Sequence, residues 1–216
     1  MKNQIDKTSW TRKEHFELFR NLDEPYFGVC INIECGEALF RCKTDGFSFY
    51  LYCIHNVLLA TDMTAEFRLR IEGEQVYLYD HIHAGTTVPR ANGTFGFARL
   101  PFKRNLNEFL ISANDAIAEV KSRSDLIRPT GDDLIRFSSI PWLAFTSLSH
   151  AHNTGNKESC PRITFGKITS SGNTSQIPMS VHVHHGLVDG IHLANFLDRF
   201  QQLMDGHSVQ SAQIHQ

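Results

Sequence analysis

The segment from Phe47 to Ala60 places the strongest constraint on how this chain can fold. It is strongly apolar and contains neither glycine nor proline, so we expect a helix that is buried inside the protein. It is shorter than the roughly 18 apolar residues that a membrane span requires, and no other stretch reaches that length. The rest of the chain must therefore supply the layers that cover this helix.

The remaining patterns mix helices with strands. Amphipathic spacing predicts helices from Asn105 to Val120 and from Gly190 onward, and Thr8 and Ser9 look like the capped start of another. Extended or strand-like runs are predicted at 26–33, 67–71, 76–79, 141–148, 162–168 and 179–184, with a polar loop at 121–136. Because strands, hairpins and helices interleave without a repeat, we expect a layered α/β or α+β fold in one domain, residues 1–216.

Composition narrows the function classes. The chain has 216 residues, 41% of them hydrophobic, which excludes wholesale disorder. Its net charge of −2 provides no basic excess for neutralising phosphates, so we expect no nucleic-acid partner. The N-terminus lacks the apolar core of a signal peptide, and the five cysteines have no C-x-x-C spacing. We therefore expect a cytoplasmic protein with reduced thiols.

The segment His184-His185-Gly186-Leu187-Val188-Asp189-Gly190 is the strongest candidate for chemistry. It joins a predicted strand to an amphipathic helix, and strand alternation places His185 on the same face as Val181 and Val183. Desolvation among apolar neighbours keeps an imidazole neutral, as a general base must be. The same pattern also fits a hydrogen-bonded core histidine, so the residues alone leave both interpretations open.

Two other histidine pairs, His81/His83 and His150/His152, have the i,i+2 spacing that puts both rings on one face of a strand. No third ligand stands at an obvious spacing from either pair. We therefore predict no metal site.

Several segments together resemble one enzyme family. His-His-x-x-x-Asp-Gly after the strand Pro178–Val183 is similar to the active-site motif of chloramphenicol acetyltransferases, and it also occurs in the acyltransferase cores of 2-oxoacid dehydrogenase complexes. Three further segments resemble the chloramphenicol acetyltransferases: Trp10–Phe16, Glu66–Arg68 with Val76–Asp80, and Ser138–Ser147. The match runs in order over nearly the whole chain, and 216 residues leave no room for the lipoyl modules of a dehydrogenase acyltransferase.

The resemblance implies a two-layer sandwich with a mixed β-sheet covered by helices. It also implies a homotrimer with active sites between subunits, and direct acetyl transfer from acetyl-CoA to the 3-hydroxyl of chloramphenicol. The residue roles that it implies are His185 as general base, Ser138 as oxyanion donor, Thr164 as holder of an ordered water, Arg12 and Asp189 as a buried bracing ion pair, Phe19, Phe27 and Leu148 as antibiotic pocket, and Trp142 and Lys167 as CoA site.

Some positions depart from the family pattern. Arg162 and His150 stand where apolar residues are usual, Ile168 replaces a tyrosine that is common near CoA, and residues 90–100 match poorly. Two alternatives therefore stay open. One is a CoA-dependent O-acyltransferase with another small hydroxyl acceptor, and the other is a non-catalytic trimeric protein that binds an aromatic ligand.

Overall fold

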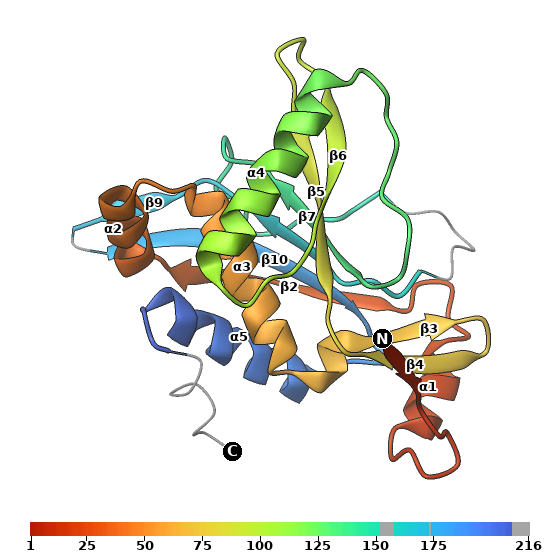
Figure 1. The fold of residues 1–216 in the computed structure, drawn as a ribbon. Coiled ribbons are helices and arrows are strands. Elements are labelled where there is room, and N and C mark those ends of the chain that lie inside the picture. Colours follow the sequence, from red (N-terminus) through yellow and green to blue (C-terminus); the bar gives the residue numbers. More distant parts are fainter. Residues whose placement is uncertain (152–157, 173, 209–216) are drawn as a thin grey trace.

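The computed structural model describes residues 1–151, 158–172 and 174–208 (Figure 1). The helices are α1 (Lys13–Phe19), α2 (Gly36–Asp45), α3 (Phe49–Asp62), a 3-10 turn η1 (Ala65–Arg68), α4 (Leu106–Ser122) and α5 (Gly190–Met204). The strands are β1 (Lys2–Gln4), β2 (Tyr26–Glu34), β3 (Leu69–Glu72), β4 (Gln75–Tyr79), β5 (His83–Pro89), β6 (Phe95–Leu100), β7 (Leu134–Ser139), β8 (Arg162–Phe165), β9 (Thr169–Ser171) and β10 (Thr174–His184).

A seven-stranded sheet organises the molecule. Its strand order is β2-β10-β8-β7-β5-β6, with β9 pairing to β10, while β1, β4 and β3 form a separate small sheet. β7 runs parallel to both β5 and β8, and the other pairs are antiparallel. The predicted mixed sheet with covering helices is therefore confirmed, and the fold is α+β.

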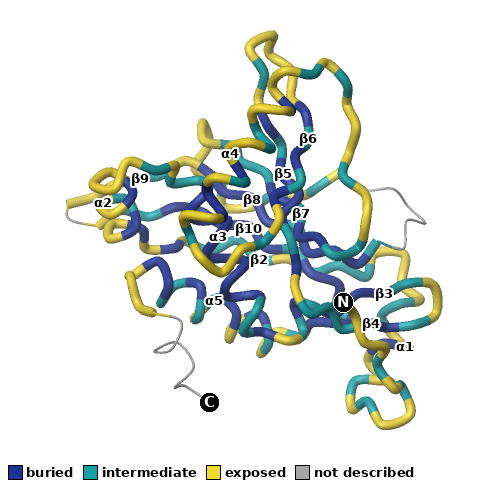
Figure 2. The backbone as a smooth tube through the Cα atoms, in the orientation of Figure 1, coloured by how far each residue is buried: buried dark blue, intermediate teal, exposed yellow. Residues whose placement is uncertain are grey.

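Helix α3 is the buried helix that the apolar run predicts. Ser48 caps its first turn by accepting a hydrogen bond from the Leu51 N–H, and every residue from Leu51 to Thr61 is buried. Figure 2 shows this helix and the centre of the sheet as the buried interior. Tyr50 of α3 and Phe200 of α5 both contact the ring of Phe165 on β8, so these two helices cover the same face of the sheet.

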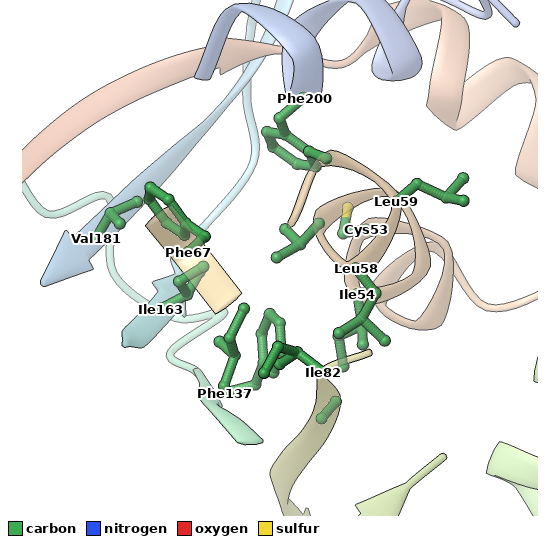
Figure 3. Packing of buried hydrophobic residues seen from close by; sticks show 14 of the residues in the cluster. Cys53, Ile54, Leu58, Leu59, Phe67, Ile82, Phe137, Ile163, Val181 and Phe200 are labelled. Atoms are coloured by element: carbon green, nitrogen blue, oxygen red, sulfur yellow. The ribbon is translucent and has the colours of Figure 1, made fainter. Parts of the chain in front are cut away.

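The two faces of the sheet differ in chemistry. Phe137, Ile163 and Val181 are register neighbours on β7, β8 and β10, and all three point into the helix-covered core (Figure 3). Side chains alternate along a strand, so the adjacent residues Ser138 on β7, Thr164 on β8 and Ser180 on β10, which are themselves register neighbours, face the other way. The face away from the helices therefore carries polar side chains.

The predicted strand at 141–148 is wrong. That segment is irregular, and the strand lies earlier, at Leu134–Ser139, inside and just beyond the predicted 121–136 loop. Gly131, with a φ of 104°, turns the chain toward β7. The polar loop expected to run to residue 136 therefore ends before Leu134, where β7 begins. Pro141 then lacks the N–H that a strand ladder needs, and Trp142 is 76% exposed.

Two further boundaries differ from expectation. Thr8 and Ser9 do not cap α1, because both hydroxyls bond to the Asp6 carboxylate in a turn and the helix starts later. β8 ends at Phe165, short of the expected residue 168. Gly166 follows it, and a Cβ there would lie 2.6 Å from the Pro178 ring and 2.8 Å from the Leu143 carbonyl oxygen. The chain leaves the strand at that close approach.

Candidate active site

His185 lies directly after β10, between two aromatic rings. Its imidazole stacks on Phe19 at a centroid distance of 3.9 Å and contacts Phe27 at 4.5 Å. The backbone N–H of His185 donates to the Pro25 carbonyl oxygen at 2.8 Å. Its Nδ1 is buried and has no hydrogen-bond partner within the described residues. The ring is thus fixed by packing and by its own backbone, with one nitrogen turned inward.

His184 shapes the turn that presents its neighbour. Its ring is buried, and its Nδ1 accepts the Gly186 N–H at 3.1 Å. Burial lowers the pKa of His184 to about 4, which keeps the ring neutral near pH 7, and the bond from Gly186 makes Nδ1 the unprotonated nitrogen. A Cβ on Gly186 would lie 3.1 Å from this ring, so the turn favours glycine.

Asp189 and Arg12 brace the turn from outside. The Asp189 carboxylate accepts the Gly190 N–H at 2.7 Å, at the start of α5, and pairs with Arg12 at 3.3 Å. The Gly190 hydrogen bond and then Arg12 lower the pKa of Asp189. Arg12 also donates to the His185 carbonyl at 3.1 Å. The ion pair is only partly buried, since the Asp189 side chain is 43% exposed, and this corrects the expectation of a buried pair.

Breaking this pair tests its bracing role. We expect Asp189→Asn and Arg12→Val each to lower activity, with Arg12→Val the worse because it also removes the bond to the His185 carbonyl. The exposure of Asp189 limits the coupling energy to about 1 kcal/mol or less. A double-mutant cycle on thermal unfolding and turnover measures it. Strictly additive losses would show that the two residues act separately.

Ser138 and Thr164 are register neighbours on the polar face of the sheet. Thr164 is buried, and its Oγ1 has no hydrogen-bond partner in the described part of the chain. A buried hydroxyl without a partner indicates a place for a water or a substrate atom. The next strand continues this row with Ser180, whose hydroxyl bonds to the His182 ring at 3.1 Å.

Within one chain, His185 and Ser138 do not meet. Ser138 on β7 is in register with Ser180 on β10, two strand spacings away, which is about 10 Å across the sheet. His185 lies five residues further along the chain from Ser180, which adds about 16 Å in the strand direction. The two residues also belong to opposite faces, because His185 packs with Phe27, the register partner of the core residue Val183. A site that uses both residues needs a second copy of the chain.

The remaining predicted site residues border this polar face. Leu148 is half-buried, and its backbone hydrogen-bonds His182. Trp142 and Lys167 are exposed, and Lys167 donates its N–H to the Leu143 carbonyl. No sequence pattern marks His182 itself. Its ring lies across Gly28, where a Cβ would be 2.3 Å away, and only the pairing of β2 with β10 brings the two together.

The histidine pairs have other partners. His81 contacts Asp62, and His83 accepts the Phe102 N–H. His150 contacts the His182 ring, while His152 lies outside the described residues. Where the structure describes the chain, no three His, Cys, Asp or Glu side chains gather in a metal-binding arrangement. None of the helices in those same ranges has the length and apolar character that crossing a bilayer requires.

Known proteins share this architecture. The family model described as chloramphenicol acetyltransferase matches residues 1–201. A chloramphenicol acetyltransferase from Proteus mirabilis is 27% identical over 213 residues, covering 93% of this chain and 94% of its own. A solved chloramphenicol acetyltransferase superposes with a TM-score of 0.88 at 30% identity, covering 94% of this chain and 100% of that one. A dihydrolipoamide acetyltransferase from Azotobacter vinelandii, at 14% identity and a TM-score of 0.67, covers 92% of this chain and 88% of its own and shares the fold alone.

Fold and relatives together define the protein as an acetyltransferase enzyme. The relatives match along nearly their full length. The chain belongs to the chloramphenicol acetyltransferase family.

Proposed function

We propose that this chain inactivates an antibiotic by transferring acetyl from acetyl-CoA to the 3-hydroxyl of chloramphenicol, as a single-domain homotrimer. The observation that carries the proposal is His185 held between Phe19 and Phe27 at the end of β10, in a chain of this family. The five cysteines, all within the described residues, are free thiols. Free thiols support a reducing compartment, the cytoplasm.

His185 is the general base in this scheme. Because Nδ1 is buried, Nε2 is the nitrogen that takes the proton from the acceptor hydroxyl. The hydroxyl oxygen attacks the thioester carbonyl of acetyl-CoA within a ternary complex, so no acyl-enzyme forms. The tetrahedral intermediate then collapses, and the CoA thiolate leaves with the proton that the imidazolium returns. The acetyl ester, CoA and neutral His185 remain.

Ser138 and Thr164 stabilise the negative charge that develops on the carbonyl oxygen of the thioester. A hydroxyl positioned at the oxyanion stabilises the transition state more than the ground state. Ser138 donates to that oxygen, and Thr164, whose buried Oγ1 has no partner among the described residues, holds an ordered water beside it. Neither role requires a metal, because a thioester is attacked readily by an oxygen that is held close and deprotonated.

Neighbouring copies assemble the site. Within one chain His185 and Ser138 lie on opposite faces of the sheet, so His185 of one copy must approach the polar face of the next. Leu143, 59% exposed and with its carbonyl oxygen close to Gly166, provides apolar surface for such packing. Phe19, Phe27 and Leu148 line the acceptor pocket in this arrangement, and Trp142 and Lys167 contact CoA.

A thiol-release assay tests the reaction directly. We expect CoA release from acetyl-CoA that depends on chloramphenicol and that His185→Ala abolishes. A non-catalytic binding protein would bind the antibiotic without releasing CoA. Release that requires a different hydroxyl compound would keep the acyltransferase and change the acceptor.

Complementation tests the shared site. We expect His185→Ala and Ser138→Ala chains, each nearly inactive alone, to recover about a quarter of wild-type turnover when they are co-expressed at equal levels. In a closed ring of randomly mixed copies, about a quarter of the interfaces pair an intact His185 with an intact Ser138. Activity no greater than the sum of the two single variants would place both residues in one copy. Co-purification of an untagged His185→Ala chain with an affinity-tagged Ser138→Ala chain confirms that mixed assemblies form.

A further inference from the structure

Arg162 occupies the polar face next to the proposed oxyanion residues. It lies two residues before Thr164 on β8 and therefore on the same face. Its register partners are Arg136 on β7 and His182 on β10. Two residues along a strand span about 6.6 Å. A substrate whose hydroxyl lies near Thr164 would thus place near Arg162 a substituent that is separated from the hydroxyl by about that distance.

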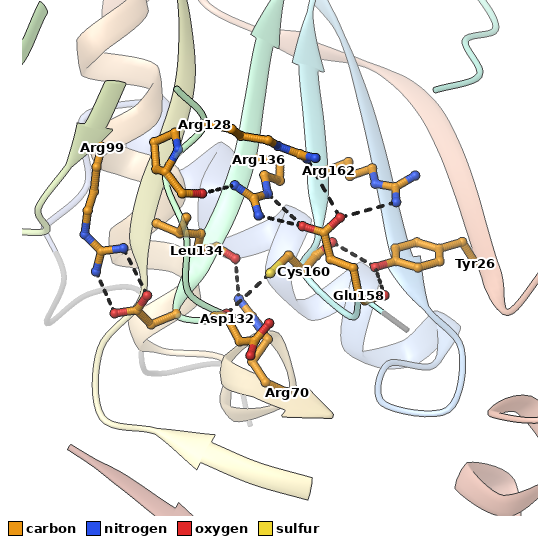
Figure 4. A network of polar contacts seen from close by, with 12 residues as sticks. Tyr26, Arg70, Arg99, Arg128, Asp132, Leu134, Arg136, Glu158, Cys160 and Arg162 are labelled. Carbon is orange, nitrogen blue, oxygen red and sulfur yellow. Dashed lines mark hydrogen bonds and ion pairs between the residues drawn. The ribbon is translucent and has the colours of Figure 1, made fainter. Parts of the chain in front are cut away.

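The charge around Arg162 is not balanced. Three guanidinium groups, those of Arg128, Arg136 and Arg162, lie within 4 Å of the Glu158 carboxylate (Figure 4). Arg136 holds it closely, at 2.7 Å, whereas Arg162 is 3.8 Å away. Within the described ranges, no other carboxylate pairs with these three arginines at that distance, and the sequence of 152–157 contains no Asp or Glu. This half-buried patch therefore carries surplus positive charge.

The ring of Tyr26 fixes the position of the Arg162 side chain. Its guanidinium lies 4.7 Å above the centre of the Tyr26 ring. The Tyr26 hydroxyl donates to the Glu158 and Cys160 carbonyl oxygens at 2.8 and 3.0 Å, which anchors the ring. The Arg162 side chain is only 15% exposed. A cation held this way is oriented in advance for a planar anion, because guanidinium groups bind carboxylates in a bidentate manner.

The neighbouring histidines add no further positive charge to this patch. Burial lowers the pKa of His182, and Arg162 lowers it further, while burial, His182 and Arg162 lower the pKa of His150 to about 4. Both rings are therefore neutral near pH 7 and add polarity without an anion. An uncharged acceptor such as chloramphenicol would leave Arg162 with only its share of the Glu158 carboxylate in the closed site.

We propose that Arg162, on its Tyr26 support, forms an anion subsite in the acceptor pocket, and that this enzyme prefers hydroxyl acceptors that carry a carboxylate. The inference rests on the proposed acetyl transfer and on the approach of a second copy to the polar face. It names the acceptor class that this chain selects, and it makes Arg162 a specificity-determining residue. The carboxylate binds the guanidinium while the hydroxyl lies beside Thr164 and Ser138.

A matched acceptor pair tests the subsite. We measure kcat/KM, by CoA release, for 4-(hydroxymethyl)benzoate and for its uncharged amide, which place the charge or its neutral equivalent across one ring from the hydroxyl. We expect the wild type to favour the acid and Arg162→Leu to reduce the acid-to-amide ratio by on the order of 10- to 100-fold, as hydrogen bonds to charged groups allow. Arg162→Lys should retain part of the preference, and Arg162→Gln, which keeps a polar side chain, should lose it. Arg128→Leu is the matched control, because Arg128 shares Glu158 but is 53% exposed, and it should leave the ratio unchanged.

Each other outcome is decisive. Equal use of acid and amide, or turnover of chloramphenicol but of neither benzoate compound, overturns the subsite and leaves the acetyltransferase standing. If none of the three acceptors releases CoA, the proposed reaction fails, and calorimetry of 4-(hydroxymethyl)benzoate binding decides the subsite alone: binding lost in Arg162→Gln supports it, and no binding overturns it. Dissociation of the assembly in Arg162→Leu and Arg162→Gln, without a change in the ratio, would assign the charge to a neighbouring copy's carboxylate instead.

Discussion

Replacing His185 with alanine is expected to lower acetyl transfer by about 10²–10⁴-fold, the usual contribution of a positioned general base. No other titratable ring contacts Phe19 and Phe27 within the described residues, so no neighbour can take over the proton. The ring is held by stacking, and the turn is held by backbone bonds that alanine keeps. Antibiotic binding and thermal unfolding should therefore change little, and CoA release with calorimetry separates the two effects.

His184→Asn is the matched control. The asparagine oxygen can still accept the Gly186 N–H that His184 accepts through Nδ1, so the turn survives while the imidazole is lost. We expect most activity to remain. If His184→Asn proved the more damaging change, the assignment of the base to His185 would be wrong.

Ser138→Ala is expected to reduce kcat by about 10²–10³-fold, which is typical for removal of one oxyanion donor. The Michaelis constants should stay nearly unchanged, because the hydroxyl acts on charge that appears only in the transition state. Steady-state kinetics with both substrates measures the separation of kcat from KM.

Ser139→Ala controls for the strand itself. Ser139 is the next residue of β7, and alternation points its side chain to the other face. We expect near-wild-type turnover from this variant. An effect of Ser138→Ala confined to KM would assign Ser138 to ground-state binding of the acceptor.

Local patterns predict the elements that are defined by their own residues. α3 is predictable because an apolar run must be buried, and the β10–α5 junction because its strand, glycines and amphipathic helix are contiguous. The segment after Ser139 misleads because its apolar residues resemble a strand, although they are exposed beside a polar face. In the proposed assembly, burial against another copy explains why such residues stand outside the core of the single chain.

The surroundings of the site depend on contacts between distant segments. The ring of Phe27 meets His185 only because β2 pairs with β10. The Tyr26 support of Arg162 comes from a distant strand, and Glu158, four residues before Arg162, reaches it from an irregular segment rather than from a helical turn. Family resemblance indicates that Arg162 is unusual at its position. That three arginines share one carboxylate there is visible only once the chain is folded and β7 lies beside β8.

The pairing of β2 with β10 also bears on how the protein is made. β2 leaves the ribosome long before its partner β10, because the two strands are far apart in the chain. A nascent chain that has emerged only through β8 therefore exposes two strands, β2 and β8, that both await β10. Non-local pairing of this kind folds slowly, and unpaired edges attract other chains. The interval before β10 emerges is thus when aggregation competes most strongly with folding, and a chain truncated before β10 has no means of closing its sheet.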